Sequence, residues 1–455
     1  MNNDDTIFAA RGPVMVLGWG RSGRAAAALL VGRGRRVLAW DDRGIPESEI
    51  GDGVVAVNTQ GVRQPDTALA DVAAVVVSPG VPAGHPVIVA ALARALPIVS
   101  ELELAFRALD APVLAVTGTN GKSTTVSVLG KILEAAGFRT FVGGNLGVPL
   151  CEAVGSGAEA VVAEVSSFQL EWVQQFRPKV AVLLEVTPDH LDRHGDFETY
   201  LATKLRLFAA QSPSDAAVVD AHAGLSERVA TAGPAPITTF GLVGTGGQEQ
   251  PTGATADPAE RRISAPNGFE VGLGSEWPVA PHDFRNAAAA VEAARLFGIS
   301  ARACEQGLSE FRPLPHRLAR VATVAGIQWW SDSKATNVAA ARSALGAFDV
   351  PVVLLVGGSS KKEDFAGLAE TSARIKLVIA YGAAGDEIEQ GLDGRLPLAR
   401  AANMTDAVAL AGETAEAGEV VLLAPACASF DEFRDYVHRS ERFHELVAGL
   451  ERTQH

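Results

Sequence analysis

Short apolar runs rich in valine and leucine alternate with alanine-rich stretches along the chain. Runs of this length predict buried strands, and the longer stretches between them predict helices. Strands that alternate with helices form parallel sheets with helices on their faces, so we expect an α/β protein. The predicted strands and apolar segments are Val14–Leu17, Val37–Trp40, Val75–Val77, Pro112–Val116, Ala160–Ala163, Val180–Val186, Val324–Trp330, Val352–Val356, Leu377–Tyr381 and Val420–Leu423.

Two breaks in this pattern divide the chain into three blocks. The first block runs to Ala108, and the third begins near Phe311, where two prolines mark a linker. A polar insert from Gly241 to Arg262 interrupts the central block and predicts an exposed loop or hairpin without assigned chemistry. We expect three domains, namely a Rossmann-like domain over residues 1–108, a central P-loop ATP-binding parallel-sheet domain over 109–310 and a Rossmann-like C-terminal domain over 311–455.

A candidate phosphate-binding loop opens the central block. Thr117–Thr124 reads TGTNGKST and lies between an apolar run and the helical stretch Thr125–Ala136. Backbone N–H groups of such a loop surround phosphates, while Lys122 spans two of them and the Ser123 hydroxyl faces a magnesium ion. The loop is shorter than an ordinary P-loop because its first glycine is Gly118, which argues against a motor or GTPase switch. The alternative is a glycine-rich turn with an exposed lysine. The predicted ATP contacts in the loop are Gly118, Thr119, Asn120, Gly121, Lys122, Ser123 and Thr124.

A dinucleotide-type fingerprint lies in the first block. The turn Gly18–Gly23 follows one strand, and Asp41 ends the next. This spacing is typical of NAD-dependent dehydrogenases, and a second alternative is glycines that only permit close packing. The arginine in Asp42-Arg43 instead suits a phosphate or a uracil-linked anion, so we favour a site for a nucleotide-diphosphate substrate. The predicted contacts are Gly18, Gly20, Arg21, Ser22, Asp41, Asp42, Arg43 and Ser78.

Two polar residues follow strands of the central block. Glu164 ends the strand Ala160–Ala163, where a carboxylate beside a phosphate loop suits magnesium; the alternative is a cap for the next helix. His190 follows the strand Val180–Val186 and has acids on both sides. A lone histidine is usually structural, but one at this edge is a better candidate ligand.

Lys204 occupies an unusual position for a lysine. It lies four residues after Tyr200, three after Leu201 and four before Phe208, which places it on the apolar face of a helix. Its stem could cover the core while the ammonium reaches water. Alternatively it faces the active cleft, where a neutral amine could react with carbon dioxide and form a carbamate, an oxygen ligand for magnesium.

Charged clusters mark the third block. They are His316-Arg317, Asp332 to Asn337, Gly357 to Lys362 and Pro425 to Ser429. We expect all four at the edge where a parallel sheet binds ligands, although each alone is a common loop sequence. Their cations indicate an anion such as a γ-phosphate or a carboxylate substrate.

Composition narrows the class of protein. The net charge of −14 argues against nucleic-acid binding, and no apolar run reaches membrane-spanning length. Three cysteines in 455 residues build neither a disulfide framework nor a zinc knuckle. The N-terminus lacks the order of a signal peptide. We therefore expect a cytoplasmic enzyme without membrane insertion.

Together these segments resemble the Mur ligase family, ATP-dependent amide-forming enzymes of peptidoglycan synthesis. The likeness covers nearly the whole chain and rests on Gly118–Thr124, on the segments 144–147 (GNLG) and 164–170 (EVSSFQL), and on Leu314–Arg317. It implies that ATP turns a carboxylate into an acyl phosphate, which an amine then attacks. The segments 332–337 and 425–429 imply D-glutamate as the acceptor and UDP-N-acetylmuramoyl-L-alanine as the other substrate. We expect a monomer.

The resemblance also implies site residues. Two magnesium ions would be held by Ser123, Glu164, His190 and a carbamylated Lys204, and the catalytic set would be Lys122, Glu164, His190, Lys204 and Arg317. Asn286, Arg317 and Asp332 would contact ATP, Asn145 the UDP substrate, and Lys334, Thr336, Lys361, Ser429 and Tyr436 the D-glutamate, with Lys362 as an alternative to Lys361.

One departure from the family concerns the segment His282-Asp283, because the family often has His-Asn there. A role for Asp283 is therefore open. The remaining alternatives are another Mur-type or a folylpolyglutamate-type ligase, an NAD-dependent dehydrogenase, and a non-catalytic nucleotide-binding regulator.

Overall fold

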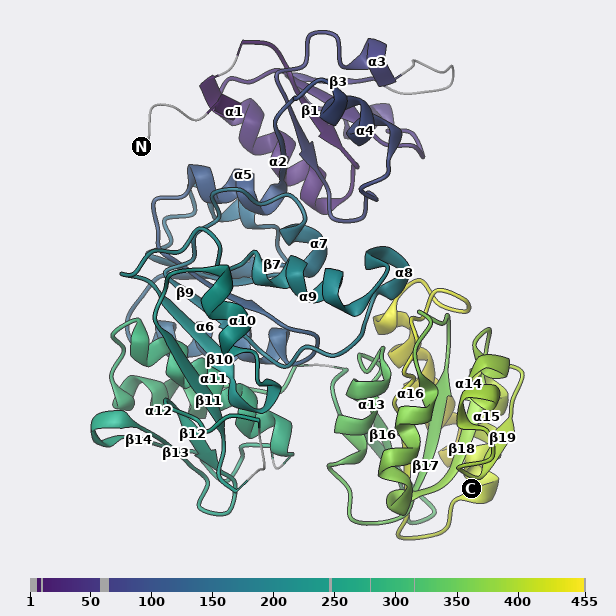
Figure 1. Cartoon of the computed structure of the whole chain (residues 1–455). Coiled ribbons are helices and arrows are strands. Elements are labelled where there is room, and N and C mark those ends of the chain that lie inside the picture. The colour runs from purple at the N-terminus through teal and green to yellow at the C-terminus, as the bar shows by residue number, and fades with distance from the viewer. Residues whose placement is uncertain are drawn as a thin grey trace. The chain divides into compact units, whose positions relative to one another are not determined.

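The computed structural model describes residues 6–9, 11–57, 65–244, 248–278, 280–314 and 316–453. Strands and helices alternate along the chain and form three separate sheets, which confirms the predicted α/β class (Figure 1). The contacts divide the chain into two compact units. Unit 1 comprises the described residues of Met1–Val186, Leu201–Trp277 and Arg285–Phe311, and unit 2 those of Thr187–Tyr200, Pro278–Phe284 and Arg312–His455. No helix in the described ranges is long and apolar enough to cross a bilayer.

The first sheet of unit 1 is parallel, with the strand order β3-β2-β1-β4-β5. The strands are β1 Val14–Leu17, β2 Val37–Trp40, β3 Val54–Ala56, β4 Ala74–Val77 and β5 Ile98–Ser100. The helices around it are α1 Thr6–Ala9, α2 Arg21–Gly32, α3 Pro65–Ala68, α4 Pro86–Ala93 and α5 Glu101–Ala108. This order matches the first five strands of the Rossmann order 3-2-1-4-5-6, in which ligands bind at the carboxyl ends of the central strands. β1 lies in the middle of the sheet and is buried throughout, as a continuous apolar run predicts.

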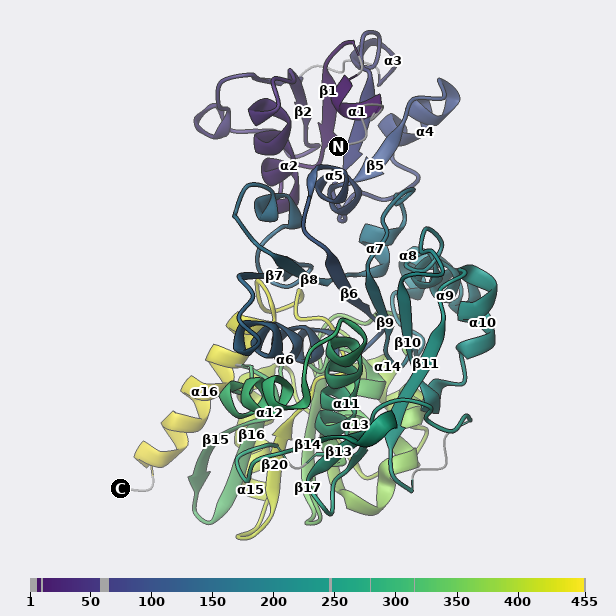
Figure 2. The same cartoon turned by 90° about the vertical axis from the view of Figure 1, so that its left-hand side faces the viewer.

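The second sheet of unit 1 has nine strands in the order β14-β13-β12-β11-β10-β9-β6-β8-β7. They are β6 Val113–Thr117, β7 Thr140–Gly144, β8 Ala160–Glu164, β9 Val180–Leu183, β10 Ala216–Asp220, β11 Ile237–Leu242, β12 Thr255–Asp257, β13 Arg262–Ala265 and β14 Phe269–Gly272. The longer helices are α6 Lys122–Ala135, α9 Phe197–Leu205, α10 Ser226–Ala232, α11 Pro281–Leu296 and α12 Ala301–Glu310, and the short ones include α7 Ser167–Leu170 and η2 Leu150–Ala153. The helices α6 and α12 pack side by side (Figure 2).

Three boundaries in this sheet differ from the prediction. The strand predicted over Val180–Val186 ends at Leu183, because the next residues turn to the phosphate loop, where the Glu185 carbonyl accepts a hydrogen bond from Thr119 N at 2.8 Å. The predicted helix Thr125–Ala136 begins earlier, at Lys122. The helix that carries Lys204 ends at Leu205, before Phe208.

The polar insert is more ordered than predicted. Residues 245–247 lie outside the described ranges, but the remainder contains β12, which pairs in parallel with β11, and the start of β13. Ala254 and Ala256 are buried. Thr252 N also donates a hydrogen bond to Thr239 Oγ1 at 2.8 Å. The predicted hairpin is confirmed, because β12 and β13 pair antiparallel, and it extends the sheet through β12 instead of lying exposed.

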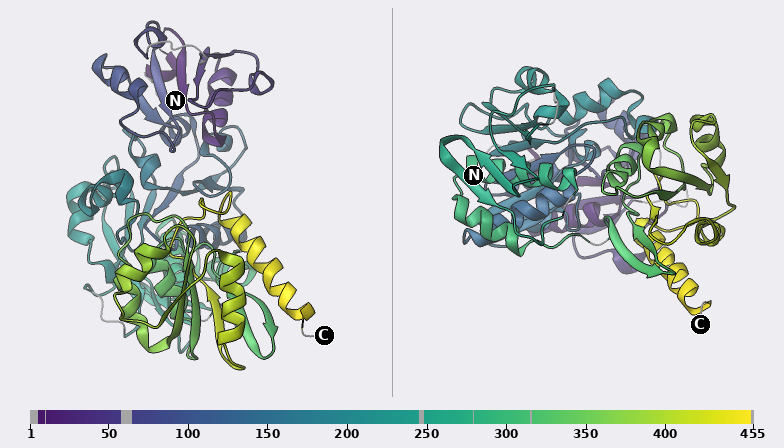
Figure 3. Two further views of the ribbon diagram at one scale, coloured as in Figure 1. Left: turned by 90° about the vertical axis from the view of Figure 1, so that its right-hand side faces the viewer. Right: turned by 90° about the horizontal axis from the view of Figure 1, so that it is seen from below.

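Unit 2 is built on a six-stranded sheet in the order β15-β16-β20-β17-β18-β19. The strands are β15 Ala319–Val324, β16 Ile327–Ser331, β17 Val352–Gly357, β18 Ile375–Tyr381, β19 Leu398–Arg400 and β20 Val420–Leu423. The helices are α8 Leu191–His194, α13 Val338–Leu345, α14 Gly385–Leu392, α15 Met404–Thr414 and α16 Tyr436–Thr453, with η5 Phe365–Arg374. Both faces carry an apolar core, because alternate residues of β17 point to opposite sides. The helix α16 runs beside β15 (Figure 3).

The apolar segment Val324–Trp330 is not one strand. It is the end of β15, a tight turn and the start of β16, and the two strands pair antiparallel. Ala325 and Gly326 at the turn have φ values of 50° and 78°, as expected for a turn of type I′. Because Ala319 pairs with Ser331, the start of β15 lies at the same edge as the carboxyl end of β16. Arg317, predicted to follow the proline linker, therefore approaches the ligand edge of the sheet from the beginning of a strand.

Candidate active site

The loop between β6 and α6 has the geometry of a phosphate cradle. It ends at the first turn of α6, and the N-terminus of a helix favours an anion. Gly121 has a φ of 82°, and a side chain there would collide with Asn286. Asn286, which is predicted to contact ATP, therefore lies directly against the loop.

Two lysines donate to the backbone of this loop. Lys122 Nζ donates to the carbonyls of Gly118 at 3.0 Å and Thr119 at 2.7 Å. Lys204 Nζ donates to the Gly118 carbonyl at 2.8 Å and is only 1% exposed. The apolar helix face thus carries Lys204 to the phosphate loop and not to solvent, so the snorkelling alternative is wrong.

Glu164 is the buried carboxylate nearest to this cradle in the sheet. It ends β8, which pairs with β6, and is 3% exposed. Its Oε1 accepts a hydrogen bond from Asn145 Nδ2 at 2.6 Å, whereas Oε2 is buried without a hydrogen-bond partner among the residues that the structure describes. An anionic oxygen left in this state is costly unless a cation binds it. The alternative role as a helix cap is wrong, because Ser166 caps α7.

No group of three or more His, Cys, Asp and Glu side chains in the described part of the chain could hold a metal by itself. Magnesium binds oxygen ligands of several kinds, including hydroxyl groups, phosphates and water. A site at Glu164 would therefore need ligands from outside these four residue types. Ser123, at the start of α6, offers a hydroxyl group.

In the first sheet, Asp41, the acid of the dinucleotide-type fingerprint, accepts hydrogen bonds from backbone N–H groups around it. Asp41 Oδ2 accepts from Trp19 N at 2.8 Å, and Oδ1 accepts from Arg43 N at 3.0 Å and Arg43 Nε at 3.2 Å. Burial alone would raise the pKa of Asp41, but these hydrogen bonds outweigh it and the pKa lies below its usual value. Ser78 Oγ donates to the Gly18 carbonyl at 2.7 Å. Asp41 and Ser78 therefore stabilise the glycine turn.

The remaining polar residues of this edge differ in exposure. The Arg43 side chain is 85% exposed, and Asp42 Oδ2 lies 3.1 Å from His85 Nε2. Arg21 Nη1 donates to the Gly147 carbonyl at 3.1 Å, which brings the start of α2 to the segment that contains Asn145.

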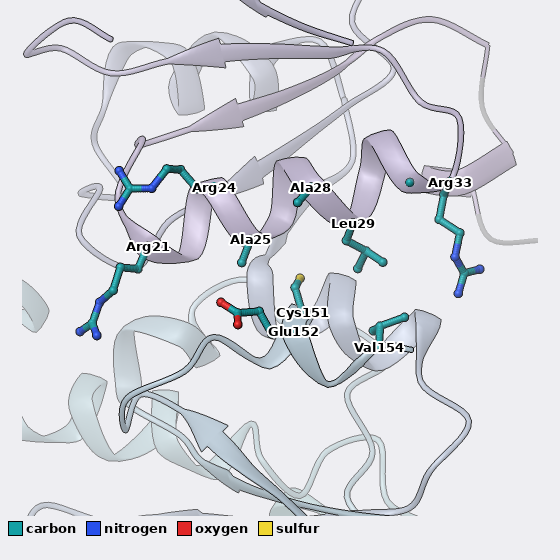
Figure 4. A pocket seen from close by; sticks show the side chains of 10 residues that line it. Arg21, Arg24, Ala25, Ala28, Leu29, Arg33, Cys151, Glu152 and Val154 are labelled. Carbon is teal, nitrogen blue, oxygen red and sulfur yellow. The ribbon is translucent and has the colours of Figure 1, made fainter. Parts of the chain in front are cut away.

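Beyond Arg21, a cavity of about 730 Å³ lies between α2 and η2. Figure 4 shows side chains of α2, among them Arg21 and Arg24, opposite Cys151 and Glu152 of η2. Of the residues that line the cavity, Arg21 is predicted to contact the UDP substrate.

In unit 2, the loops after β16, β17 and β20 meet around a residue that the sequence analysis missed. Arg439 of α16 is fully buried, and its guanidinium donates to Ser333 Oγ at 3.1 Å and to the carbonyls of Ser333 at 2.9 Å, Cys427 at 3.0 Å and Ala428 at 3.2 Å. Burial lowers its pKa from the usual value. The spacing of four to the buried Phe443, and from there to Val447, could have identified it, just as similar spacing identified Lys204.

The lysine predicted to bind the D-glutamate side chain already has an anionic partner. Lys361 Nζ lies 3.1 Å from Asp189 Oδ1, and Asn337 Nδ2 donates to Asp189 Oδ2 at 3.2 Å. Burial would raise the pKa of Asp189, but the charge of Lys361 and the adjacent His190 outweigh it and lower the pKa. Lys362, the alternative, is exposed.

Lys334 lies over the ring of Tyr436, with Nζ 4.0 Å from the ring centroid. Two other predicted acceptor residues, Thr336 and Ser429, lie in the loops after β16 and β20. The loop residues predicted to bind D-glutamate thus gather at the carboxyl edge of the sheet in unit 2.

A second charged cluster in unit 2 contains two carboxyl groups. Burial raises the pKa of Asp283 to about 7 and that of Asp332 to about 6, and the charge of Arg317 acts in the opposite direction on both. His282 Nε2 lies 3.6 Å from Asp283 Oδ1, and its Nδ1 lies 2.9 Å from Ser343 Oγ. Three separate segments therefore bring these groups together.

The predicted site residues are divided between the two units. Unit 1 contains Gly18, Gly20, Arg21, Ser22, Asp41, Asp42, Arg43, Ser78, Gly118, Thr119, Asn120, Gly121, Lys122, Ser123, Thr124, Asn145, Glu164, Lys204 and Asn286. Unit 2 contains His190, Arg317, Asp332, Lys334, Thr336, Lys361, Ser429 and Tyr436.

Three family models match the chain in succession. They are a Mur ligase MurD-like N-terminal domain over residues 12–100, a Mur ligase middle domain over 116–294 and a Mur ligase glutamate ligase domain over 316–427. Each match contains one of the three sheets or most of it.

Similar curated proteins match nearly the whole length of the chain. The UDP-N-acetylmuramoylalanine–D-glutamate ligase of Anaeromyxobacter dehalogenans is 42% identical over 95% of this chain and 97% of its own length. The protein of the same name from Acidobacterium capsulatum is 41% identical over 95% of each. Among solved structures, the MurF ligase of Thermotoga maritima in complex with ADP has a TM-score of 0.61 at 18% identity, over 98% of this chain and 96% of that one. This structural likeness supports the fold.

Proposed function

The chain belongs to the Mur ligase family, and we propose on that basis that it is an ATP-dependent ligase that joins D-glutamate to UDP-N-acetylmuramoyl-L-alanine. Relatives of that name that are about two-fifths identical over nearly their whole length support the choice of substrates. The observation that carries the chemistry is the phosphate loop next to a buried carboxylate with an unpaired oxygen, Glu164 Oε2.

A carboxylate and an amine do not condense in water by themselves. ATP phosphorylates the carboxylate of the UDP substrate, the amine of D-glutamate attacks the acyl phosphate, and the tetrahedral intermediate expels phosphate. Negative charge moves during both steps, so the protein has to supply positive charge and N–H donors at fixed positions.

The phosphate loop and the start of α6 would bind the ATP phosphates. Lys122 donates to two carbonyls of its own loop, within reach of phosphates seated in the cradle. We propose that it exchanges these carbonyls for phosphate oxygens when ATP binds. Asn286 would contact the nucleotide from beside Gly121, and Arg317 and Asp332 of unit 2 complete the proposed ATP residues.

Glu164 and Ser123 fit a magnesium ion, because the first offers an unpaired buried oxygen and the second a hydroxyl group at the start of α6. A bound magnesium ion would neutralise negative charge on the transferring phosphoryl group. A carbamate on Lys204 would add oxygen ligands beside the phosphate loop, where its amine now donates to Gly118. His190, in unit 2, stays a predicted ligand of a second ion.

The carbamate can be tested without measuring activity. Protein exchanged with ¹³C-labelled bicarbonate should give a carbamate carbonyl resonance that is absent from Lys204→Ala. Lys131→Ala, at an exposed lysine, is the matched control and should keep the resonance. Recovery of ligase activity in Lys204→Ala by added short-chain carboxylates would support the same role, whereas full activity of Lys204→Arg would contradict it.

For the UDP substrate, we propose the edge formed by Gly18, Gly20, Arg21, Ser22, Asp41, Asp42, Arg43, Ser78 and Asn145. Both oxygens of Asp41 already accept hydrogen bonds from the protein, so any further contact of Asp41 with the UDP substrate would use its remaining acceptor sites. For D-glutamate, we propose Lys334, Thr336, Lys361, Ser429 and Tyr436. Lys361 would have to exchange Asp189 for a substrate carboxylate, or share it.

The decisive experiment is release of phosphate from ATP in the presence of UDP-N-acetylmuramoyl-L-alanine and a panel of D- and L-amino acids. We expect release with D-glutamate and little with L-alanine or diaminopimelate. Preference for another amino acid would overturn the acceptor but keep the ligase chemistry. Binding of NADH, followed by its fluorescence, together with no phosphate release would overturn both.

A further inference from the structure

His85, which has no role in the proposed site, links two segments at the carboxyl edge of the first sheet. Its Nε2 lies 3.1 Å from Asp42 Oδ2 and 3.2 Å from Asp42 Oδ1. Asp42 follows β2, and His85 lies between β4 and α4; the strands β2 and β4 flank β1 in the sheet. The contact therefore connects the segments on either side of the glycine turn, where we propose that the UDP substrate binds.

The ring of His85 is held in one orientation and one tautomer. It is 8% exposed and caps α4, because its Nδ1 accepts a hydrogen bond from Val87 N at 3.2 Å. A backbone N–H can only donate, so Nδ1 carries a lone pair, and this hydrogen bond assigns the ring proton to Nε2. His85 thus donates to the carboxylate of Asp42.

A second donor holds the same carboxylate from the end of β2. Trp40 Nε1 donates to Asp42 Oδ1 at 3.0 Å. The Asp42 side chain is nevertheless 69% exposed. Because a carboxylate has about four acceptor sites, Asp42 keeps acceptor capacity that is open to solvent. A carboxylate that two protein donors orient and that stays accessible can accept a hydrogen bond from a ligand.

Asp41, the neighbouring acid, has the opposite arrangement. Its side chain is 9% exposed, and its two oxygens accept from Trp19 N and Arg43 N. The spacing of the dinucleotide-type fingerprint identifies Asp41 as the acid that faces a ligand, but the more accessible carboxylate belongs to Asp42.

We propose that Asp42, oriented by His85, is the carboxylate that recognises the nucleoside of the UDP substrate. The nucleoside offers hydrogen-bond donors at N3 of uracil and at the ribose hydroxyls, and a carboxylate oxygen can accept from any of them. The diphosphate offers acceptors and negative charge, so a carboxylate does not suit it. His85 need not touch the substrate and is a positioning residue that acts through Asp42. This inference rests on the proposed function.

The test separates the two hydrogen bonds of His85. Asparagine can still cap α4 by accepting from Val87 N, but its shorter side chain does not reach Asp42. His85→Asn should therefore keep the urea midpoint and raise the KM for UDP-N-acetylmuramoyl-L-alanine about fivefold, with kcat and the KM for ATP unaltered. Asp42→Asn should raise the same KM about tenfold. The matched control is Asp52→Asn, at an exposed acid before β3, which should change neither KM.

A double variant distinguishes positioning through Asp42 from an independent structural role. If His85 acts through Asp42, His85→Asn combined with Asp42→Asn should have the KM of Asp42→Asn alone. Multiplication of the two increases would overturn the inference, and so would an unchanged KM for the UDP substrate in Asp42→Asn.

The donor on the nucleoside can be identified with competitors of the UDP substrate. UDP is compared with its N3-methyl, 2′-deoxy and 3′-deoxy analogues, each of which lacks one donor. Loss of the donor that Asp42 recognises should weaken competition about tenfold in the wild type and hardly at all in Asp42→Asn. If the wild type binds all four nucleotides equally well, Asp42 does not recognise the nucleoside and the inference is wrong.

A spectroscopic measurement covers the case in which His85→Asn does not fold. The ¹⁵N resonance of His85 Nε2 should shift when UDP binds to the wild type and stay unchanged in Asp42→Asn. The same shift in both proteins would contradict an action through Asp42. Failure of the proposed function gives a different result, because the wild type would then release no phosphate from ATP with UDP-N-acetylmuramoyl-L-alanine and D-glutamate.

Discussion

In the first sheet of unit 1, carboxylates bind the backbone after the strands, whereas in the sheet of unit 2 a guanidinium does so. Asp41, after β2, accepts from backbone N–H groups, and Glu101, after β5, accepts from Cys151 N at 2.6 Å. In unit 2, Arg439 donates to carbonyl groups of the loops that follow β16 and β20. Loops at the carboxyl edge contain both N–H and C=O groups that need partners. An anionic side chain can accept from the N–H groups, and a cationic side chain can donate to the C=O groups.

This contrast bears on how a charged residue after a strand should be interpreted. Asp41 has the position of a ribose ligand, yet its oxygens are used within the protein. Arg439 lies far along the chain from the loops that it joins, yet it connects segments that carry proposed acceptor residues. For these two residues, the partner of the charged side chain follows from the backbone groups around it and not from its position in a motif.

The largest effect on stability should come from removing the guanidinium of Arg439. Arg439→Met leaves several buried carbonyl groups without donors, and we expect a loss of about 3–5 kcal/mol in the free energy of unfolding of unit 2. Hydrogen exchange of peptides from β16, β17 and β20 would locate the loss. Arg442→Met, at a half-exposed arginine of the same helix, is the control and should cost little. A loss below about 1 kcal/mol would show that the loops hold without the guanidinium.

A smaller effect that depends on pH is expected at Glu101. Burial raises its pKa to about 7, and in the described part of the chain no group donates a hydrogen bond to Oε2. Between its usual value of 4.5 and about 7, the folded protein holds a proton that the unfolded chain has released, so stability falls as pH rises through this window.

Glu101→Gln should reduce that fall by up to about 3 kcal/mol, measured by urea unfolding at pH 5 and pH 8. The exposed Glu134→Gln is the control and should leave the pH dependence unchanged. An unaltered slope in Glu101→Gln would mean that Glu101 is ionised in the folded protein throughout this range.

Asp41 should contribute less to the free energy of unfolding than Arg439 and Glu101, because it binds a turn near the surface. Asp41→Ala leaves Trp19 N without an acceptor, and we expect a loss of about 2 kcal/mol at pH 7. Since the folded pKa of Asp41 is lowered, the loss should shrink as pH falls through that value. Asp42→Ala, at an exposed acid, is the control. Unchanged stability of Asp41→Ala together with weaker binding of NADH than by wild type would contradict the structural role.

The smallest effect on stability should be at Arg43, whose side chain is mostly exposed. Arg43→Ala should leave the urea midpoint unchanged but raise the KM for UDP-N-acetylmuramoyl-L-alanine several-fold, with the KM for ATP unaltered. Arg36→Ala, at another exposed arginine of the first sheet, should change neither constant. An equal rise in both KM values would place Arg43 outside the UDP site.

Local patterns predicted much of this molecule. Apolar runs identified β1, β2 and β4 of the first sheet, β6, β8 and β9 of the second, and β17, β18 and β20 of the third, whereas β3, β5, β7, β10 to β14 and β19 were not predicted. Helical spacing placed Lys204 on an apolar helix face. The end of β9 was wrong because Glu185 leaves the sheet for a hydrogen bond with Thr119, a contact that no local pattern encodes. The hairpin between β15 and β16 was missed because Ala325 adopts a turn conformation that usually needs glycine or asparagine.

Contacts between residues that lie far apart in the chain were mostly not predicted. Asp189 was seen only as a neighbour of His190, although it pairs with Lys361 and Asn337 in the folded protein. Arg439 was missed because most of its partners are backbone carbonyls, which carry no sequence signal, so that only its spacing to Phe443 indicated burial. Whether His190 joins Glu164 and Lys204 at a metal stays a prediction.

The interleaving of the two units along the chain matters while the protein is being made. Asp189 leaves the ribosome long before Lys361 and Asn337, so its contacts in unit 2 wait for the C-terminal segment. His282 likewise precedes Ser343. A chain that stalls in synthesis near Phe311 carries two stretches of unit 2 without their partners. For the same reason, a fragment that starts at Arg312 lacks pieces of its own fold, and expression of that segment alone should give a poorly folded product.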